Sequence, residues 1–267
     1  MKKLFFIGAG KMASAIAGGL TASGKFSGGE LGAFDPDQKS AEAFQKASGV
    51  SVDTNSPECG INESSALLLA VKPQVIASLA VYRDLMKDKL IISIAAGISI
   101  DKLKEITGSS RIIRVMPNTP ALVGKGASGY ACSENVSIEE EKFGREILES
   151  IGIAFKFNES ALDAVTALSG SGPAYVFEFI QALADGGVAE GLPHDTALIL
   201  AAQTLIGAAE MVLKTGEHPS SLKDKVTSPA GTTSRALEVL AERSFSGTVI
   251  KAVRASAARS RELGKSK

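Results

Sequence analysis

The chain has 267 residues, of which 45% are hydrophobic, and its 29 Lys and Arg residues balance 29 Asp and Glu residues. This length and apolar content suit two folded domains, and the balanced charge excludes a global field that attracts nucleic acid or an anionic membrane. The 2 cysteines and 2 histidines share no motif spacing, so we expect neither a disulfide framework nor a bound metal. The first apolar run stops at Gly8, far short of a signal-peptide core, and we expect a soluble, cytoplasmic protein.

The first half of the chain alternates short apolar runs with segments of helical spacing. The runs lack period-two alternation, which is expected of parallel strands covered on both faces. They span residues 4–7, 31–34, 66–71, 90–94 and 112–115, with two further short strands at 127–132 and 154–157. The helical segments between them span residues 12–23, 41–48, 76–86 and 100–107. Repeated strand–helix units predict a doubly wound α/β domain over residues 1–158.

The second half, from residue 159 to 267, shows helical patterns only. Its segment 194–213 is apolar nearly all the way round, and a helix without a polar face must be enclosed. The uncharged run within it, 196–209, has 14 residues, whereas a membrane span needs about 20. About 107 residues give little room to enclose such a helix. We therefore predict an all-helical domain in which a second subunit covers this segment.

A glycine motif, G-A-G-K-M-A over residues 8–13, follows the first strand directly and opens a helix. Gly8 permits a tight turn, Gly10 lets the backbone approach a pyrophosphate, and Ala13 allows close packing of helix on strand. The helix start adds unpaired N–H groups that favour phosphate. The motif therefore predicts a dinucleotide-binding site.

Asp35 ends the second strand, where an acid normally accepts hydrogen bonds from the adenosine ribose and favours NAD. Lys39 lies close enough in sequence to offset this charge if the loop folds back. Alternatively, residues 35–37 are only a turn. The choice between NADH and NADPH therefore stays open.

Two loops at residues 70–73 and 95–97 end strands at the carboxyl edge of the sheet, where ligands of such folds bind. Their small residues let a flat ring lie against the backbone, although Lys72 is equally consistent with a solvated loop charge. Residues 116–120 are either a rigid turn or a wall of the same site.

Two hydroxyl-rich loops mark the helical half, at residues 167–175 and 226–233. The first loop has no side chain at Gly170 or Gly172, which allows another group to approach its backbone closely, and its Pro173 stands at a helix start. The second presents backbone N–H groups and hydroxyls at a helix N-terminus, which suits a carboxylate or another small anion. The alternative for the second loop is an ordinary capped helix start.

Six segments occur in the order and spacing of pyrroline-5-carboxylate reductases, and the chain resembles this family over nearly its whole length. They are GAGKMA, AVKPQ, SIAAGI, RVMPNTP, DAVTALSGSGPAY and HPSSLKDKVTSPAGTTSRAL. The resemblance implies a Rossmann-type domain followed by an all-helical dimerisation domain. It implies reduction of 1-pyrroline-5-carboxylate to L-proline, the last step of proline biosynthesis, by NADPH or NADH in a homodimer that often assembles further.

The resemblance also implies the site residues. The substrate contacts would be Glu159, Thr166, Ser228, Gly231, Thr232 and Thr233. The cofactor contacts would be Ile7, Gly8, Ala9, Gly10, Lys11, Met12, Asn55, Ala70, Val71, Lys72, Pro73, Ala95, Ala96 and Gly97, to which the second strand adds Asp35. Two positions depart from the family pattern. Ala230 stands where glycine is usual, and Asp35 stands where relatives with a strong NADPH preference carry a small polar residue.

The reaction itself asks little of the protein beyond placement. Hydride transfer to a C=N bond is carried by the cofactor, so the protein mainly positions the reacting carbons. An iminium is already activated, and neither a metal nor a strong general acid is needed. Our hypothesis is that Thr233 is the catalytic residue that hydrogen-bonds the ring nitrogen, while N–H groups of residues 231–233 hold the substrate carboxylate.

Two alternatives remain. A β-hydroxyacid dehydrogenase has a similar layout but carries a catalytic Lys in the glycine-rich start of its second domain, and residues 169–175 contain none. A regulator that senses NAD(P) without turnover has little reason for two hydroxyl-rich loops.

Overall fold

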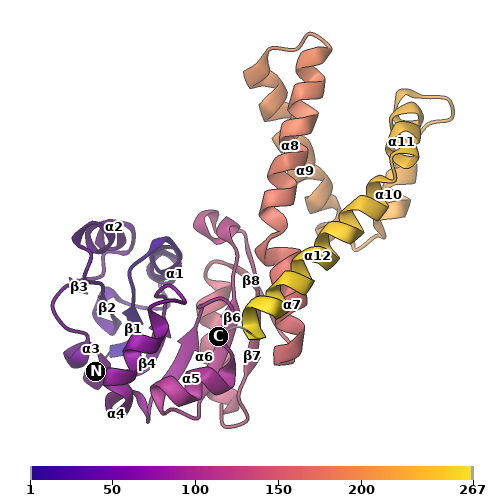
Figure 1. Cartoon of the computed structure of the whole chain (residues 1–267). Coiled ribbons are helices and arrows are strands. Elements are labelled where there is room, and N and C mark those ends of the chain that lie inside the picture. The colour runs from indigo at the N-terminus through magenta and orange to yellow at the C-terminus, as the bar shows by residue number, and fades with distance from the viewer. Residues whose placement is uncertain (1, 266–267) are drawn as a thin grey trace. The chain divides into compact units, whose positions relative to one another are not determined.

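The computed structural model describes residues 2–265, and the chain divides into two compact units. The first unit combines residues up to Ser171 with the segment from Ser256 onward. The second unit is Gly172–Ala255. Figure 1 labels the elements of both units. The first turns and the last turns of the predicted helical half therefore belong to the same unit as the sheet.

The first unit contains an eight-stranded sheet in the order β3-β2-β1-β4-β5-β6-β7-β8. The strands are β1 Lys2–Ile7, β2 Leu31–Phe34, β3 Val52–Asp53, β4 Ser64–Leu69, β5 Leu90–Ser93, β6 Ile112–Met116, β7 Gly126–Cys132 and β8 Gly152–Lys156. The first six are parallel, and strand order reverses at β1, with β2 on one side and β4 on the other. This reversal is the switch point where doubly wound sheets bind ligands, as the sequence predicts.

Helices cover both faces of this sheet, because alternate side chains of each parallel strand point to opposite faces. Leu4 and Phe6 pack with α1 (Lys11–Ala22), α2 (Gln38–Ser48) and α6 (Ile138–Glu149). Phe5 and Ile7 pack on the other face with α3 (Glu58–Glu63), α4 (Arg83–Met86) and α5 (Ile100–Thr107). Continuous apolar strands are therefore buried on both sides, and the predicted fold class is confirmed.

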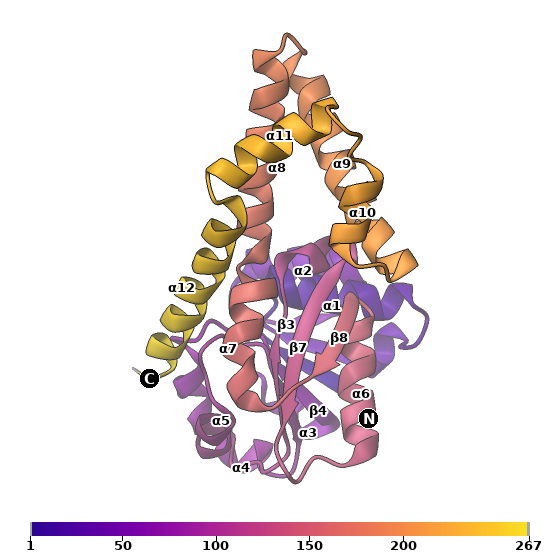
Figure 2. The same ribbon diagram turned by 90° about the vertical axis from the view of Figure 1, so that its right-hand side faces the viewer.

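The end of the sheet differs from an all-parallel arrangement. β7 pairs with β6 in the antiparallel sense, and β8 pairs with β7 in the parallel sense. Figure 2 shows β7 and β8 side by side, with α6 beside β8. The chain returns from β6 to β7 through the short 3-10 helix η3 (Thr119–Val123), whereas a parallel crossover needs about a dozen residues or more. The short connection therefore reverses the strand direction.

Some elements of the fold are absent from the prediction made from the sequence. Helix α6 begins with a capping box, in which the Ser137 hydroxyl accepts the Glu140 N–H and the Glu140 carboxylate accepts the Ser137 N–H. The spacing S-x-x-E was available in the sequence as a start signal. Strand β3 has two residues, too few for a pattern. The predicted helix 76–86 is a 3-10 helix η2 (Ile76–Tyr82) followed by the short α4.

Several short helices lead from β8 toward the second unit. They are η4 (Glu159–Ala161), α7 (Leu162–Val165) and a π-helical segment η5 (Thr166–Gly170). The last strand ends at Lys156, so the prediction that strand signals stop near residue 160 is confirmed.

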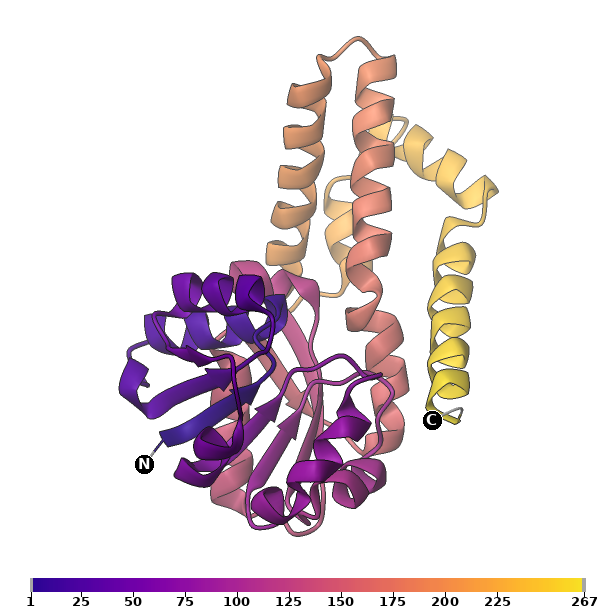
Figure 3. The same cartoon turned by 60° about the vertical axis from the view of Figure 1, so that its left-hand side comes forward.

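The second unit is helical. It contains α8 (Gly172–Ala189), α9 (His194–Thr215), α10 (Pro219–Lys225) and α11 (Thr232–Glu242), and the start of α12 (Phe245–Lys265). Figure 3 shows α8 and α9 side by side, joined by a short loop. Ala184 of α8 and Ala197 and Ala201 of α9 are buried between them, which lets the two helices approach closely. Phe179 and Phe245 also stack in this unit, with ring centroids 5.6 Å apart.

The sequence predicts that a second subunit covers helix α9, and in the single chain most of this helix is exposed. Ile199 is 68% exposed and Leu213 is 77% exposed, on a helix of 22 residues that is apolar enough by length and composition to cross a membrane. Only 11% of its most apolar window is buried. A contiguous apolar surface of this kind marks an interaction site. This exposure agrees with the prediction that a second subunit covers the helix, which stays a prediction.

Candidate active site

The glycine loop between β1 and α1 has the geometry that the motif predicts. Gly8 has φ +101°, and a Cβ on it would lie 2.8 Å from the carbonyl carbon of Ala70. A side chain is therefore excluded here by both the backbone angle and the neighbouring strand. A Cβ on Gly10 would meet nothing within 4 Å, so this backbone faces open space. Gly10 is the N-cap of α1, and among the described residues no side chain caps this helix start. The loop thus offers free N–H groups to a phosphate.

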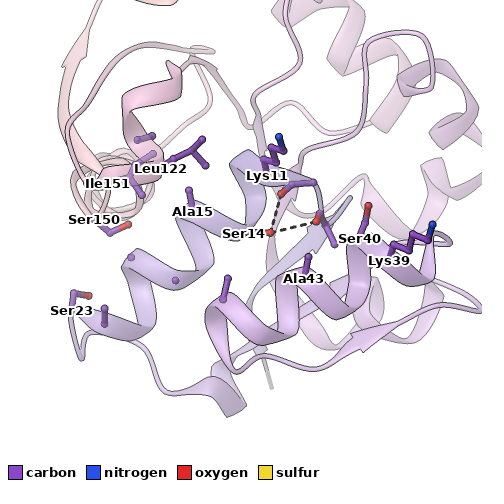
Figure 4. A pocket seen from close by; sticks show the side chains of 18 residues that line it. Lys11, Ser14, Ala15, Ser23, Lys39, Ser40, Ala43, Leu122, Ser150 and Ile151 are labelled. Atoms are coloured by element: carbon purple, nitrogen blue, oxygen red, sulfur yellow. Dashed lines mark hydrogen bonds between the residues drawn. The ribbon is translucent and has the colours of Figure 1, made fainter. Parts of the chain in front are cut away.

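A cavity of about 890 Å³ begins at this loop and follows the outer side of α1. Figure 4 shows Lys11 at its edge, with Ser14 bonded back to the carbonyls of Ala9 and Gly10. Lys39 and Ser40 of α2 line the same cavity. The lining is mostly small side chains, which leave the helix backbone accessible. Of the predicted cofactor contacts, Ala9, Gly10 and Lys11 lie in it.

Asp35 lies next to the glycine loop. The N–H of Ala9 donates to Asp35 Oδ2 at 2.7 Å, and the N–H of Asp37 donates to Asp35 Oδ1 at 2.9 Å. The carboxylate is therefore fixed at the end of β2 by two backbone donors. The alternative of a simple turn also describes part of the structure, because Asp37 caps α2 by accepting the Ser40 N–H at 2.9 Å. Hydrogen bonds from the Ser40 hydroxyl and from its N–H, helped by the Lys39 ammonium, lower the pKa of Asp37, so Lys39 acts on Asp37.

Asn55 follows β3 at the same edge of the sheet. β3 pairs with β2 so that Asp53 faces Phe34, and Asp35 N–H donates to the Asp53 carbonyl at 3.1 Å. Asn55 lines a cavity of about 430 Å³ together with residues 51–54. Asp35 and Asn55 thus follow neighbouring strand ends, where the adenosine half of a dinucleotide binds in such folds.

The two loops predicted at the carboxyl edge, or rim, of the sheet are residues 70–73 and 95–97, and they follow the adjacent strands β4 and β5. The Ala70 N–H donates to the Ile7 carbonyl at 2.8 Å, and the Ile94 N–H donates to the Leu69 carbonyl at 3.1 Å, so the loops start in register. Lys72 is exposed. A cavity of about 320 Å³ lies at this rim and is lined by Pro73, Ala96, Gly97, Thr166, Ser171, Ser256, Arg259, Ser260 and Leu263. Predicted cofactor contacts and the predicted substrate contact Thr166 therefore share one cavity.

Thr166 directly precedes the hydroxyl-rich loop at residues 167–175, called the hydroxyl loop below, and hydrogen bonds hold both in place. Thr166 Oγ1 donates to the Leu162 carbonyl at 2.7 Å, so its hydrogen is engaged and its oxygen can accept from a ligand. The buried Asn118 donates to the Ser169 carbonyl at 3.0 Å and accepts the Ala127 N–H at 2.9 Å. Segment 116–120 therefore supports the hydroxyl loop and links it to β7, a role that the sequence left undecided.

Glu159 is engaged within the first unit. Its Oε1 accepts the Ile100 N–H at 2.8 Å and a guanidinium N–H of Arg114 at 2.7 Å. Glu159 thus connects the start of α5 to β6, and the sequence analysis did not single out Arg114. The predicted role of Glu159 as a substrate contact remains a prediction.

The turn at residues 228–233 lies in the second unit, and its form agrees with an anion site. Gly231 N–H donates to the Ser228 carbonyl at 3.1 Å, and Ser228 Oγ folds to within 2.2 Å of where a Cβ on Gly231 would lie. Gly231 is the N-cap of α11, and no described side chain caps this helix start. Ala230 has φ +55°, the left-handed region that favours glycine. Thr232 is exposed and Thr233 half-buried, so both are open to a ligand.

Two large pKa shifts lie in β7. Burial, with the neighbouring Glu141 carboxylate, raises the pKa of Tyr130 to about 12 and that of Cys132 to about 11. Neither group titrates near neutral pH. Within residues 2–265, no three His, Cys, Asp or Glu side chains come together as a metal site. The candidate site thus consists mainly of backbone donors, hydroxyls and small residues, with Lys11, Asp35 and Arg259 among its charged side chains.

An open glycine loop on a doubly wound sheet, followed by a helical unit, is the layout of an NAD(P)-dependent oxidoreductase of Rossmann type. Residues 3–97 match the family model described as NADP oxidoreductase, coenzyme F420-dependent. Residues 159–263 match the model described as pyrroline-5-carboxylate reductase dimerisation.

Relatives match over almost the whole chain. The pyrroline-5-carboxylate reductase of Arabidopsis thaliana is 46% identical over 266 residues, covering 99% of this chain and 96% of that protein. The solved structure of a pyrroline-5-carboxylate reductase from Coxiella burnetii has a TM-score of 0.92 at 33% identity, covering 98% of each chain. That of Plasmodium falciparum pyrroline carboxylate reductase with NADP bound has a TM-score of 0.87 at 37% identity, again over 98% of each. The chain belongs to the pyrroline-5-carboxylate reductase family, and its residues 159–263 match the dimerisation domain of that family.

Proposed function

We propose that this protein reduces 1-pyrroline-5-carboxylate to L-proline by hydride transfer from NADH or NADPH, the last step of proline biosynthesis. The observation that carries the proposal is the turn at residues 228–233. It combines an uncapped helix N-terminus with accessible hydroxyls and contains no acid that would repel a carboxylate. Such a turn suits a small imino acid, which carries one carboxylate and one ring nitrogen.

The substrate carboxylate binds at the start of α11 in this proposal. N–H groups of residues 231–233 donate to it, aided by the positive end of the helix dipole, and the Ser228 hydroxyl lies beside the same N-cap. Thr233 hydrogen-bonds the ring nitrogen and so orients the C=N bond. Glu159 and Thr166 are the remaining proposed substrate contacts, with Thr166 accepting through its free lone pair.

The dinucleotide fits the first unit. Open space over Gly10 and the uncapped start of α1 suit the pyrophosphate, while Asp35 and Asn55 lie at the strand ends that hold the adenosine. Residues 7–12, 70–73 and 95–97 form the proposed cofactor contacts. When bound, the reduced nicotinamide supplies the hydride. The protein's own residues bind, orient and shield the reacting groups, which is how placement accelerates the transfer.

The two alternatives are less well supported. Oxidation of a β-hydroxyacid needs a base in the second domain, and the loop and helix start at residues 169–175 supply no lysine. A sensor of NAD(P) has no need for the accessible turn at residues 228–233.

We further propose that the protein is a cytoplasmic homodimer, able to assemble further, in which a second copy covers α9. Its ligands are the imino acid, proline and the dinucleotide, and it binds neither nucleic acid nor membrane. The equal numbers of basic and acidic residues support this, since neither polyanion is attracted by the whole chain.

The test is an absorbance assay that follows loss of NADH and of NADPH with pyrroline-5-carboxylate as substrate. We expect consumption of the dinucleotide that depends on the imine and yields proline. Dinucleotide binding without turnover would favour the sensor, and reduction of a β-keto acid in place of the imine would favour the dehydrogenase.

A further inference from the structure

The last turns of α12 present one face to the hydroxyl loop within the first unit. Ala257 is buried, and Ser256 and Ser260 are half-buried. Ser260 Oγ donates to Asp163 Oδ1 at 2.6 Å, and Ser256 Oγ donates to Ser171 Oγ at 3.2 Å. Asp163 precedes the π-helical segment η5 and Ser171 follows it. Two hydroxyls one helical turn apart therefore hold both ends of η5.

Segment η5 depends on such contacts. Ser171 N–H donates to the Thr166 carbonyl at 2.7 Å, which closes a wide turn five residues long. π-helical turns are rare and occur often at functional sites. Within the segment Ala167 is buried, whereas Leu168 is exposed. Packing therefore holds only part of the segment, and tertiary hydrogen bonds fix its two ends.

The face of α12 that holds η5 also forms a wall of the rim cavity. Its members are spaced i, i+3, i+4 and i+7, the spacing of one helix stripe, and they are Ser256, Arg259, Ser260 and Leu263. The opposite walls of this cavity include Gly97 and Thr166. A shift of α12 or of η5 therefore changes the place where a proposed cofactor contact and a proposed substrate contact meet.

We propose that Ser260 and Asp163 are positioning residues for the imine reduction, which hold Thr166 in place by clamping η5 to α12. The inference rests on the proposed function, because Thr166 is a substrate contact only there. Of the two bonds, Ser260 to Asp163 is the stronger, since it is short and its acceptor is a carboxylate. Thr166 itself contacts the substrate, and the clamp acts through it.

The experiment compares Ser260→Ala and Ser260→Thr with the parent enzyme by steady-state kinetics. Loss of a hydrogen bond to a charged group typically lowers the affinity that depends on it by roughly tenfold or more. We therefore expect Ser260→Ala to raise the KM for the imino acid about tenfold, with the KM for the dinucleotide changed less than about twofold. Ser260→Thr keeps the hydroxyl and should restore the parent KM.

A double variant tests the pairing. Because Ser260 and Asp163 act through one bond, Ser260→Ala combined with Asp163→Ala should raise the KM for the imino acid no more than the worse single variant. Ala258→Ser is the matched control, since it places a hydroxyl on the exposed side of the same turn. This control should leave both KM values unchanged.

Several results would overturn the inference. One is a Ser260→Ala enzyme that melts at a lower temperature but keeps the parent KM for the imino acid, which would make the bond purely structural. Another is a Ser260→Thr enzyme that is not rescued, and a third is additive effects in the double variant. A folded parent enzyme that fails to reduce the imine would instead overturn the proposed function, and this inference with it.

Discussion

Replacing Asp35 by serine should shift the balance between the two reduced dinucleotides toward NADPH. The Asp35 carboxylate is held at the end of β2 by N–H groups of Ala9 and Asp37, at 2.7 and 2.9 Å. At this strand end the adenosine ribose of a bound dinucleotide presents its 2′ oxygen. NADPH carries a phosphate there, whereas NADH carries a hydroxyl that donates a hydrogen bond to a carboxylate.

The size of the shift follows from the charges. A phosphate of charge about −2 lying roughly 5.5 Å from the carboxylate, at an effective dielectric of about 60, is repelled by roughly 2 kcal/mol. This repulsion corresponds to about thirtyfold in affinity. The serine also weakens the hydrogen bond to the NADH ribose, by about 1 kcal/mol. We expect the ratio of kcat/KM for NADPH to that for NADH to rise by roughly 30-fold from the repulsion alone and roughly 150-fold from both effects.

The assay measures initial rates with each dinucleotide at fixed imino acid, for the parent, Asp35→Ser and Asp37→Ser. Asp37→Ser makes the same charge change two residues away, but its carboxylate caps α2 through Ser40. This control should change the ratio less than about threefold, and it should change stability little because serine caps a helix start about as well as aspartate. An equal shift in both variants would mean that net charge alone acts, and an unchanged ratio in Asp35→Ser would refute the reasoning.

Three further predictions concern the turn at residues 228–233 and an exposed ion pair. Thr233→Ala should lower kcat/KM for the imino acid by about ten to a few hundred times, the effect of one hydrogen bond. The controls Thr233→Ser and Thr227→Ala should leave kcat/KM near the parent value. An unchanged kcat/KM in Thr233→Ala would reject the proposed role of Thr233. Ala230→Gly removes the strain of a side chain at φ +55° but makes the unfolded chain more flexible, and these two effects oppose each other. The net result should be a rise of about 0.5 kcal/mol in the free energy of unfolding. Ala236→Gly, within exposed α11, should instead lower it by about 1 kcal/mol, and denaturant titration checks both. The Lys3 ammonium, with the N–H and hydroxyl of Ser27, lowers the pKa of Glu30 from 4.5 to about 2. Its folded-state pKa lies below the unfolded value, so its stabilisation is complete above about pH 4.5 and is lost as the pH falls through 2. Glu30→Gln should therefore be less stable than the parent at pH 6 but not at pH 2, and a difference that persists at pH 2 would contradict this.

The first unit was largely predictable, because its signals are local. Continuous apolar strands, the glycine motif and the strand–helix alternation each depend on residues close in sequence, and they predict a doubly wound sheet. The direction of β7 was not predictable in this way. It depends on a connection too short for a crossover, which only the paired strands reveal.

The candidate site shows the same difference between features set by local sequence and features set by contacts between distant residues. The sequence by itself predicted the segments of the candidate site, from glycines, hydroxyls and an acid at strand and helix ends. Only the tertiary structure decided that Glu159 pairs with Arg114, that Asn118 supports the hydroxyl loop and that α12 returns to clamp η5. These contacts join residues 45 to 97 positions apart, so no local pattern encodes them. Side-chain hydrogen bonds between distant segments depend on where the packed core has placed each backbone, and that placement exists only after folding.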